Sequence, residues 1–170
     1  AHGALDELLG AVAQVGCQAP VFLKIAPDIA DEDVGPIIDA IARHGLDGII
    51  VSNTTIQRPD SLSSKHMGEG GGLSGPPIFA RSTELVRQFR RGAGPDLAII
   101  GVGGIDSADT AYAKIRAGAN AIQLYTGLVY HGPGLVQRIK SGLVKRLQAD
   151  GFVSVAEAVG VDCNRRSSDG

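Results

Sequence analysis

The chain has 170 residues, enough for one domain with a substantial hydrophobic core. Hydrophobic residues make up 44% and charged residues 20% of it, and the net charge is −2. That balance excludes a broad basic surface, so neither nucleic acid nor an anionic membrane surface is an expected partner. No apolar run reaches the roughly 18 residues of a membrane span. The two cysteines, Cys17 and Cys163, have neither metal-ligand nor disulfide spacing and so favour a reducing compartment.

Short apolar segments, the expected strands, alternate with amphipathic segments, the expected helices. Each apolar segment ends in glycine or polar residues, and apolar residues at helical spacing follow it. Near-continuous apolar strands separated by such helices predict a parallel sheet covered by helices. The predicted strands span residues 21–26, 48–53, 97–102 and 121–125, and the predicted helices begin near residues 5, 34, 78, 107 and 133.

Capping residues and apolar stripes sharpen these helix predictions. Asp31 or Asp33 is expected to cap the helix near residue 34, and Asp106 or Ser107 the helix near residue 107. The stripes expected to face the core are Leu5, Leu8, Leu9, Val12 and Val15 in the first helix, and Leu135, Val136, Ile139, Leu143, Val144 and Leu147 in the last.

The most informative motif is a pair of glycine-containing turns after the third and fourth predicted strands. Residues 99–105 read Ile-Ile-Gly-Val-Gly-Gly-Ile, and residues 122–127 read Ile-Gln-Leu-Tyr-Thr-Gly. Two such turns in succession are what the last two units of a (β/α)8 barrel use to hold a phosphate. Glycine lets backbone N–H groups approach phosphate oxygens, and the helix that follows adds a favourable dipole. The sequence therefore predicts a phosphorylated ligand or cofactor.

Four strand–helix units are half of the eight that close such a barrel, which typically takes ~250 residues. The expected fold class is therefore α/β, the C-terminal half of a (β/α)8 TIM barrel, over residues 1–163. The polar residues 164–170 are expected to form a disordered tail. Half a barrel exposes sheet edges, so we expect it to need a missing half-barrel or a second copy of itself.

Polar residues at the ends of the first two strands are candidates for ligand contacts. Lys24 interrupts an apolar strand, and a buried ammonium group is costly without an anionic partner. We therefore expect it to touch a ligand rather than to extend into water. Residues 53–55, Asn-Thr-Thr, either close a local turn or offer donors and acceptors to a planar ligand with carbonyl and carboxylate groups.

The segment from residue 56 to 77 is polar and rich in glycine, and it is too long for a simple connection. Arg58 and Lys65 within it are either solvated or help to close a lid over an anionic substrate. Its Leu-Ser-Gly-Pro end, residues 73–76, favours an ordered turn whose backbone faces a ligand. None of the four histidines has metal-ligand spacing, so no metal site is expected.

Five motifs, taken together and in this order, resemble dihydroorotate dehydrogenase, specifically its quinone-linked class 2. The motifs are Phe-Leu-Lys-Ile-Ala-Pro-Asp at residues 22–28, Val-Ser-Asn-Thr-Thr at 51–55, Gly-Gly-Leu-Ser-Gly at 71–75, Ile-Gly-Val-Gly-Gly at 100–104 and Gln-Leu-Tyr-Thr-Gly-Leu at 123–128. Their order and spacing are those of the family over nearly the whole chain.

The resemblance implies a (β/α)8 barrel with FMN at its C-terminal mouth, where the protein positions a flavin that carries the redox chemistry. It implies that the Lys24 ammonium contacts the flavin ring and stabilises negative charge on it. The residues that it implies at the cofactor are Lys24, Ser52, Gly75, Gly104, Tyr125 and Thr126, and those that it implies at the pyrimidine of dihydroorotate are Asn53 and Thr54.

The resemblance also implies the reaction, which is FMN-dependent oxidation of dihydroorotate to orotate with quinone as acceptor, in pyrimidine biosynthesis. It implies peripheral attachment at the cytoplasmic side of the inner membrane. The family's catalytic serine base and its quinone-admitting N-terminal helices belong to the other half of the barrel. No serine here matches the base motif, so no catalytic residue is assigned, and we expect little turnover from this chain alone.

Two other functions remain open on the residues themselves. The phosphate turns also suit a non-redox barrel enzyme, an isomerase or lyase that acts on a phosphorylated sugar. The exposed sheet edges suit a non-catalytic half-barrel that assembles with a partner chain. Lys24 together with residues 53–55 favours a flavin and a pyrimidine over either alternative.

Overall fold

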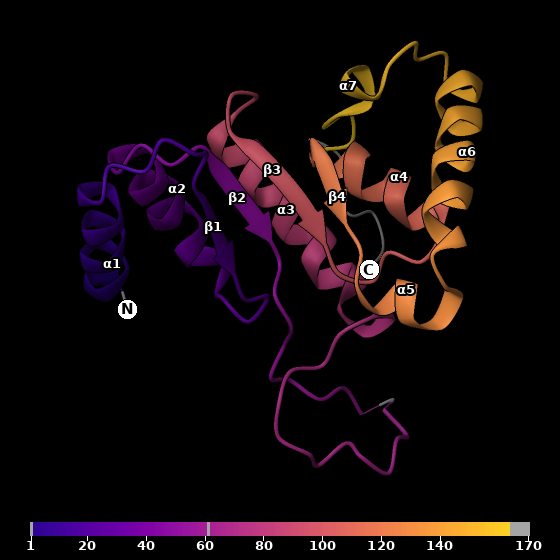
Figure 1. The fold of residues 1–170 in the computed structure, drawn as a ribbon, viewed down its shortest axis with the longest axis horizontal. Coiled ribbons are helices and arrows are strands. Elements are labelled where there is room, and N and C mark those ends of the chain that lie inside the picture. The colour runs from indigo at the N-terminus through magenta and orange to yellow at the C-terminus, as the bar shows by residue number, and fades with distance from the viewer. Residues whose placement is uncertain (1, 61, 164–170) are drawn as a thin grey trace.

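The computed structural model describes residues 2–60 and 62–163, and its centre is a four-stranded parallel sheet (Figure 1). The strands lie side by side in the order in which they occur in the sequence, so each pairs with its neighbours along the chain. This confirms the predicted α/β class with a parallel sheet. The strands are β1 (Phe22–Ile25), β2 (Gly48–Val51), β3 (Ala98–Val102) and β4 (Ala121–Gln123), and the helices that connect them are α2 (Val34–Arg43), α3 (Phe79–Ala93) and α4 (Ala108–Ala117).

Helices at both ends of the chain complete the fold. Helix α6 begins where the last helix was expected, and α5 is an additional short helix before it, which ends at Gly132 with a φ of 69°. No helix in the described residues has the length and apolar character to cross a bilayer. The remaining elements are α1 (His2–Gln14), η1 (Asp31–Asp33), η2 (Pro76–Ile78), α5 (Thr126–His131), α6 (Gly134–Ala149) and α7 (Val155–Ala158).

The two faces of the sheet differ in burial. On one face the side chains of Ile49, Val51 and Ile99 are fully buried and pack with α2 and α3 in the main core. Side chains alternate along a strand, so the residues between these point to the other face. The register aligns Lys24, Ile50, Ile100 and Ala121 in one row there, with Lys24 and Ala121 exposed and the two isoleucines half-buried. That row corresponds to the inward-facing layer of a closed barrel.

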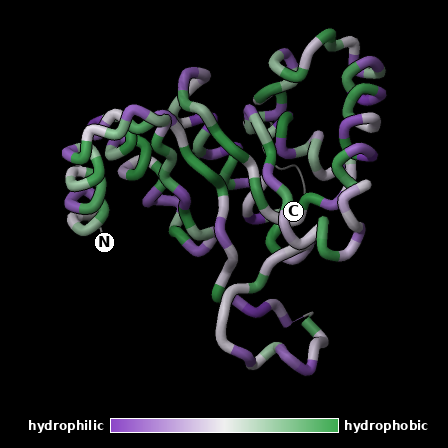
Figure 2. Tube along the Cα trace, viewed as in Figure 1, coloured by the Kyte–Doolittle hydropathy of each residue, from purple (hydrophilic) through white to green (hydrophobic). Residues whose placement is uncertain are grey.

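Figure 2 shows the same division by hydropathy, with hydrophobic residues along β2 and β3 and a mostly polar or neutral loop projecting below them. Two smaller clusters join α4 to the C-terminal helices, one with Ala111, Leu135 and Ile139 and the other with Ile115 and Leu147. The predicted inward residues Val136 and Val144 are 43% and 52% exposed, so the buried stripe of α6 is narrower than expected.

The first helix is less buried than its sequence predicts. Leu9 is 3% exposed, whereas Leu8 is 58% and Val15 is 79% exposed. The reason is that α1 packs beside α2 at one end of the sheet and has one covered side only (Figure 1). The Asp6 carboxylate fixes this contact by accepting hydrogen bonds from Arg43 and pairing with His44 Nε2 at 2.8 Å.

One of the two capping predictions is right and one is wrong. Ser107 caps α4 in a capping box with Thr110, in which each side chain accepts from the backbone N–H of the other. No aspartate side chain caps α2, because residues 31–33 form a 3-10 turn instead. The Asp31 carboxylate there pairs with Arg81 of α3 at 2.6 Å.

Candidate functional site

The carboxyl ends of all four strands meet at one edge of the sheet, because the strands are parallel (Figure 1). The predicted site residues follow the strands at this edge or come from the loop between β2 and α3. In barrels of parallel strands this is the edge that carries binding and catalytic groups. The structure therefore brings the predicted site to one end of the molecule.

The turn after β2 is held by backbone contacts to both neighbouring strands. Ser52 is 2% exposed, and its N–H donates to the carbonyl of Val102 at 3.3 Å. The N–H of Asn53 donates to the carbonyl of Ile25 at 2.7 Å, and its Oδ1 accepts from the N–H of Thr54 at 2.9 Å. The Val51–Ser52 peptide is cis. These bonds fix where the Asn53 and Thr54 side chains leave the sheet.

Three of the predicted site residues at this edge have exposed side chains: Lys24, Asn53 and Thr54. For Lys24 this differs from the buried ammonium group that its place in an apolar strand suggested. Lys24 lies on the open face of the sheet, where the described residues provide no second layer to bury it. Thr54 lies against Gly72, where a Cβ would come within 1.8 Å of Thr54 Oγ1, so only glycine fits there.

Asp28 has a structural part in the site that the sequence did not reveal, although it lies within the first family-like motif. Its carboxylate accepts hydrogen bonds from Thr55 Oγ1 and from the N–H of Ile56 at 3.2 Å. Thr55 also forms an antiparallel bridge with Leu73, with N···O distances of 3.0 and 2.8 Å. The two ends of the long loop are therefore tied to each other, and Asp28 ties the first of them to the turn after β1.

Arg58 organises the inside of that loop. Its guanidinium donates to the carbonyls of Met67 at 3.2 Å, Glu69 at 3.3 Å and Gly71 at 2.8 Å, and also to those of residues 55–57. The group is thus neither simply solvated nor free to close over a substrate, which were the two predicted roles. It is half-buried and holds the two sides of the loop together.

Replacing Arg58 by alanine is expected to loosen this loop without unfolding the sheet, because the carbonyls lose their shared donor. Thermolysin, which cleaves at apolar residues such as Leu62 and Met67, should cut the loop about fivefold faster or more. Lys65→Ala is the control, since that side chain is exposed in the same loop. Equal cleavage of both variants would show that Arg58 does not order the loop.

Three glycine-containing turns converge beside this loop. A Cβ on Gly75, whose φ is 82°, would lie 3.2 Å from Thr126 Cγ2, and the hydroxyls of Ser74 and Thr126 are 2.8 Å apart. Gly104 has a φ of 71° and packs on the start of α3, where its Cβ would lie 2.4 Å from Phe79 Cβ. The turns after β3 and β4 and the end of the long loop therefore touch.

Backbone donors at these turns are unpaired. The N–H groups of Gly104, Tyr125 and Thr126 have no hydrogen-bond acceptor among the described residues. Tyr125 is 82% exposed. Unpaired backbone N–H groups at glycine turns are suited to hold a phosphate. We call the turns at Gly75, Gly104 and residues 125–126 the glycine cradle.

Comparisons with known proteins identify the family of the chain. The family profile described as dihydroorotate dehydrogenase matches residues 2–147. The chain belongs to the dihydroorotate dehydrogenase family. It is 54% identical to the dihydroorotate dehydrogenase (quinone) of Parvibaculum lavamentivorans over 86% of this chain and 42% of that protein. With the enzyme of the same description from Xanthobacter autotrophicus it shares 54% identity over 85% of this chain and 41% of that protein.

Solved structures place the fold in the same family. The ligand-free dihydroorotate dehydrogenase of Eimeria tenella superposes with a TM-score of 0.80 at 46% identity, over 83% of this chain and 39% of that one. The chain thus spans about two fifths of the length of these relatives. The dihydroorotate dehydrogenase fold is a TIM barrel, and the four-stranded parallel sheet forms part of it, as the sequence predicts.

A buried lysine behind the glycine cradle is the main feature of the site that sequence reasoning missed. Lys114 of α4 is fully buried, and its Nζ donates to Ser82 Oγ and to the carbonyl of Phe79 at 3.5 Å. Burial lowers the pKa of its ammonium group to about 7. The sequence did hold a signal, because Lys114 lies on the same helical face as the apolar Ala111 and next to Ile115.

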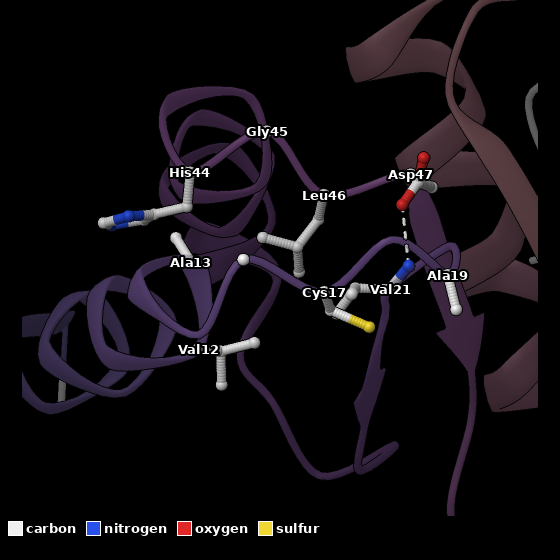
Figure 3. A pocket seen from close by; sticks show the side chains of 10 residues that line it. Val12, Ala13, Cys17, Ala19, Val21, His44, Gly45, Leu46 and Asp47 are labelled. Carbon is white, nitrogen blue, oxygen red and sulfur yellow. Dashed lines mark hydrogen bonds between the residues drawn. The ribbon is translucent and has the colours of Figure 1, made fainter.

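A pocket at the other end of the sheet is less suited to chemistry. It lies at the amino ends of β1 and β2, beside α1, and includes Cys17, His44 and Asp47 (Figure 3). The Asp47 carboxylate accepts a hydrogen bond from the N–H of Val21 at 2.6 Å and is thereby used to join the two strand entrances. Residues at this end of a barrel serve stability rather than catalysis.

Proposed function

We propose that this chain is the FMN-binding part of a quinone-dependent dihydroorotate dehydrogenase, which oxidises dihydroorotate to orotate. The observation that carries the proposal is the glycine cradle, in which unpaired N–H groups meet at the carboxyl edge of this family's sheet. Relatives that share about half of its residues are described as dihydroorotate dehydrogenase (quinone). We propose residues 1–163 as the C-terminal half of the barrel.

The residues at the cradle fit the phosphate end of FMN. The N–H groups of Gly104, Tyr125 and Thr126 would donate to phosphate oxygens, and Gly75 would leave room for them, since a Cβ there would crowd Thr126. When bound, the flavin supplies the acceptor for the hydride of the substrate. Ser52, buried between β2 and β3, would form part of the floor beneath it.

The exposed polar residues would act on the ring and the substrate. Lys24 extends from the open face, where its ammonium group would stabilise negative charge that develops on the ring. Asn53 and Thr54 follow β2 with exposed side chains and would donate and accept hydrogen bonds with the pyrimidine. Because the Asn53 N–H is anchored to β1, the two side chains would hold the substrate in one orientation for transfer.

The remaining parts of the enzyme would come from the rest of the relatives' length. We propose no residue of this chain as the catalytic base. The open row at Lys24, Ile50, Ile100 and Ala121 supports assembly with the other half-barrel or, without it, with a second copy. That other half would bind quinone and attach the enzyme to the cytoplasmic side of the inner membrane. Little turnover is therefore expected from this chain alone.

The proposal is tested by titrating the chain with FMN and following the quenching of flavin fluorescence. Saturable binding is expected, and riboflavin, which lacks the phosphate, should bind about tenfold more weakly or worse because the cradle N–H groups have no anion to hold. Inorganic phosphate should compete with FMN. Tyr125→Ala is the matched control and should bind normally, since it keeps the backbone N–H.

Two results would count against the proposal. Equal affinity for FMN and riboflavin would show that the glycine cradle does not hold the phosphate. Tight binding of a phosphorylated sugar with no binding of FMN would favour the non-redox barrel enzyme instead.

A further inference from the structure

Lys114 is a buried cation without a buried anion. Its side chain is 0% exposed, and its contacts are a hydroxyl, a carbonyl and the Phe79 ring, whose centroid is 5.1 Å from Nζ. A buried ammonium group is costly unless an opposite charge compensates it. Burial lowers the pKa of its ammonium group, and no carboxylate among the described residues pairs with Nζ.

The elements around Lys114 adjoin the Gly104 turn of the glycine cradle. From α3 it is faced by Phe79 and Ser82, and from β3 by Gly101, where a Cβ would lie 3.5 Å from Lys114 Cδ. Phe79 is also the residue on which Gly104 packs. The charge therefore lies directly behind the turn that follows β3, on the helix side of the sheet.

Polar contacts lead from the lysine toward the turn. Lys114 Nζ donates to Ser82 Oγ, whose own hydroxyl donates to the carbonyl of Ile78 at 2.7 Å and lies 3.4 Å from the carbonyl oxygen of Gly103. That carbonyl and the N–H of Gly104 belong to one trans peptide and so point in opposite directions. With the carbonyl turned toward Ser82 and Lys114, the Gly104 N–H is turned away from them, into the cradle.

We propose that Lys114 is the buried counter-charge of the phosphate held in the glycine cradle, and that phosphate binding draws a proton onto it. Lys114 does not touch the phosphate; it acts through Ser82 and the Gly103–Gly104 peptide and is a positioning residue. The inference rests on the proposed function, since it takes the ligand to be the phosphate monoester of FMN. It adds that FMN affinity depends on a side chain from the helix side of the sheet.

The protonation state of Lys114 before and after binding determines whether protons are taken up or released. With a pKa of about 7, Lys114 is only about one-tenth charged at pH 8 before binding. A phosphate monoester, with a second pKa of about 6, is already a dianion at that pH. Its negative charge raises the pKa of the lysine, which takes a proton from the buffer. FMN binding at pH 8 should therefore take up protons, at most one per molecule bound, and riboflavin binding none.

The experiment is calorimetric titration of the full chain with FMN and with riboflavin at pH 8, in two buffers of different ionisation enthalpy. The variants are Lys114→Met, which keeps the length of the side chain, and Lys140→Met, the same change at an exposed lysine of α6. We expect proton uptake with FMN in the wild type and in Lys140→Met, and none in Lys114→Met. FMN affinity in Lys114→Met should fall about tenfold or more, with riboflavin affinity unchanged.

The outcomes separate this inference from the proposed function. FMN binding stronger than riboflavin binding but without proton uptake, or with equal uptake in Lys114→Met, would overturn the role of Lys114 and leave the flavin site intact. No binding of either flavin would overturn both. If Lys114→Met does not fold, the comparison of FMN with riboflavin in the wild type still decides, because it needs no variant.

Discussion

Gly104→Ala is expected to destabilise the protein by about 3–5 kcal/mol, one of the largest losses from a single added methyl group. The new Cβ would lie 2.4 Å from Phe79 Cβ and 2.8 Å from Phe79 Cα, so either α3 or the turn must move. The φ of 71° at Gly104 adds the strain of a left-handed residue with a side chain. Urea unfolding followed by circular dichroism measures the loss.

Gly45→Ala separates these two causes. Gly45 has a φ of 66°, close to that of Gly104, but nothing lies within 4 Å of its added Cβ. It should therefore cost only the conformational strain, about 1–2 kcal/mol. Similar losses in the two variants would show that the contact with Phe79 does not constrain the turn. A charged side chain at Gly104 would also displace α3, so a loss of FMN binding in such a variant would not report on the phosphate contact alone.

The free energy of unfolding of the ligand-free protein is expected to rise by about 4 kcal/mol between pH 7 and pH 10 on account of Lys114. The pKa of its ammonium group is 10.5 in the unfolded chain and about 7 in the folded protein. Between these values the unfolded state holds one more proton than the folded state, so stability increases with pH. Below pH 7 both states are protonated and the folded state bears a buried charge.

Lys114→Met isolates this contribution, because all other titrating groups are common to both proteins. The variant should be more stable than the wild type by a few kcal/mol at pH 6, and the difference should shrink as the pH rises toward 10. Chemical unfolding of both proteins across that range measures it. Parallel pH profiles would contradict the prediction and mean that the lysine keeps its ordinary pKa in the folded protein and is charged in both states across this range. A stabilised variant that binds FMN poorly would show that the charge is retained for binding.

The strands were predictable because each is a short apolar run that stops at a glycine or polar residue, and β2 and β3 are its clearest cases. Helix α4 was equally predictable, because Ser107 caps its start and Gly118 ends it. The short helix α5 was not, since the six residues 126–131 carry no apolar periodicity long enough to read. The positions of the site residues along the chain were therefore available from the sequence, together with the edge of the sheet at which they meet.

What the sequence could not provide is which surface is covered. Lys24 and Lys114 both interrupt apolar patterns, yet one is exposed and the other fully buried. The difference arises because Lys24 points to the open face of the sheet, whereas Lys114 points between α3 and β3. The same limit explains Leu8 and Val144, whose apolar side chains follow the helical stripe but have no neighbouring element to cover them. Burial is a property of packing between elements and is only weakly encoded in any one of them.

The bridge between Thr55 and Leu73 has a consequence for how the chain can vary and fold. The bridge closes residues 56–72 into a separate loop. The length of chain that must be ordered before β2 pairs with β3 is therefore shorter than the number of residues between the two strands. Residues can be gained or lost at the tip of this loop without shifting the register of Ile49 on Ile99. Insertions and deletions in this segment at the binding edge can therefore occur during evolution without changing how the sheet folds.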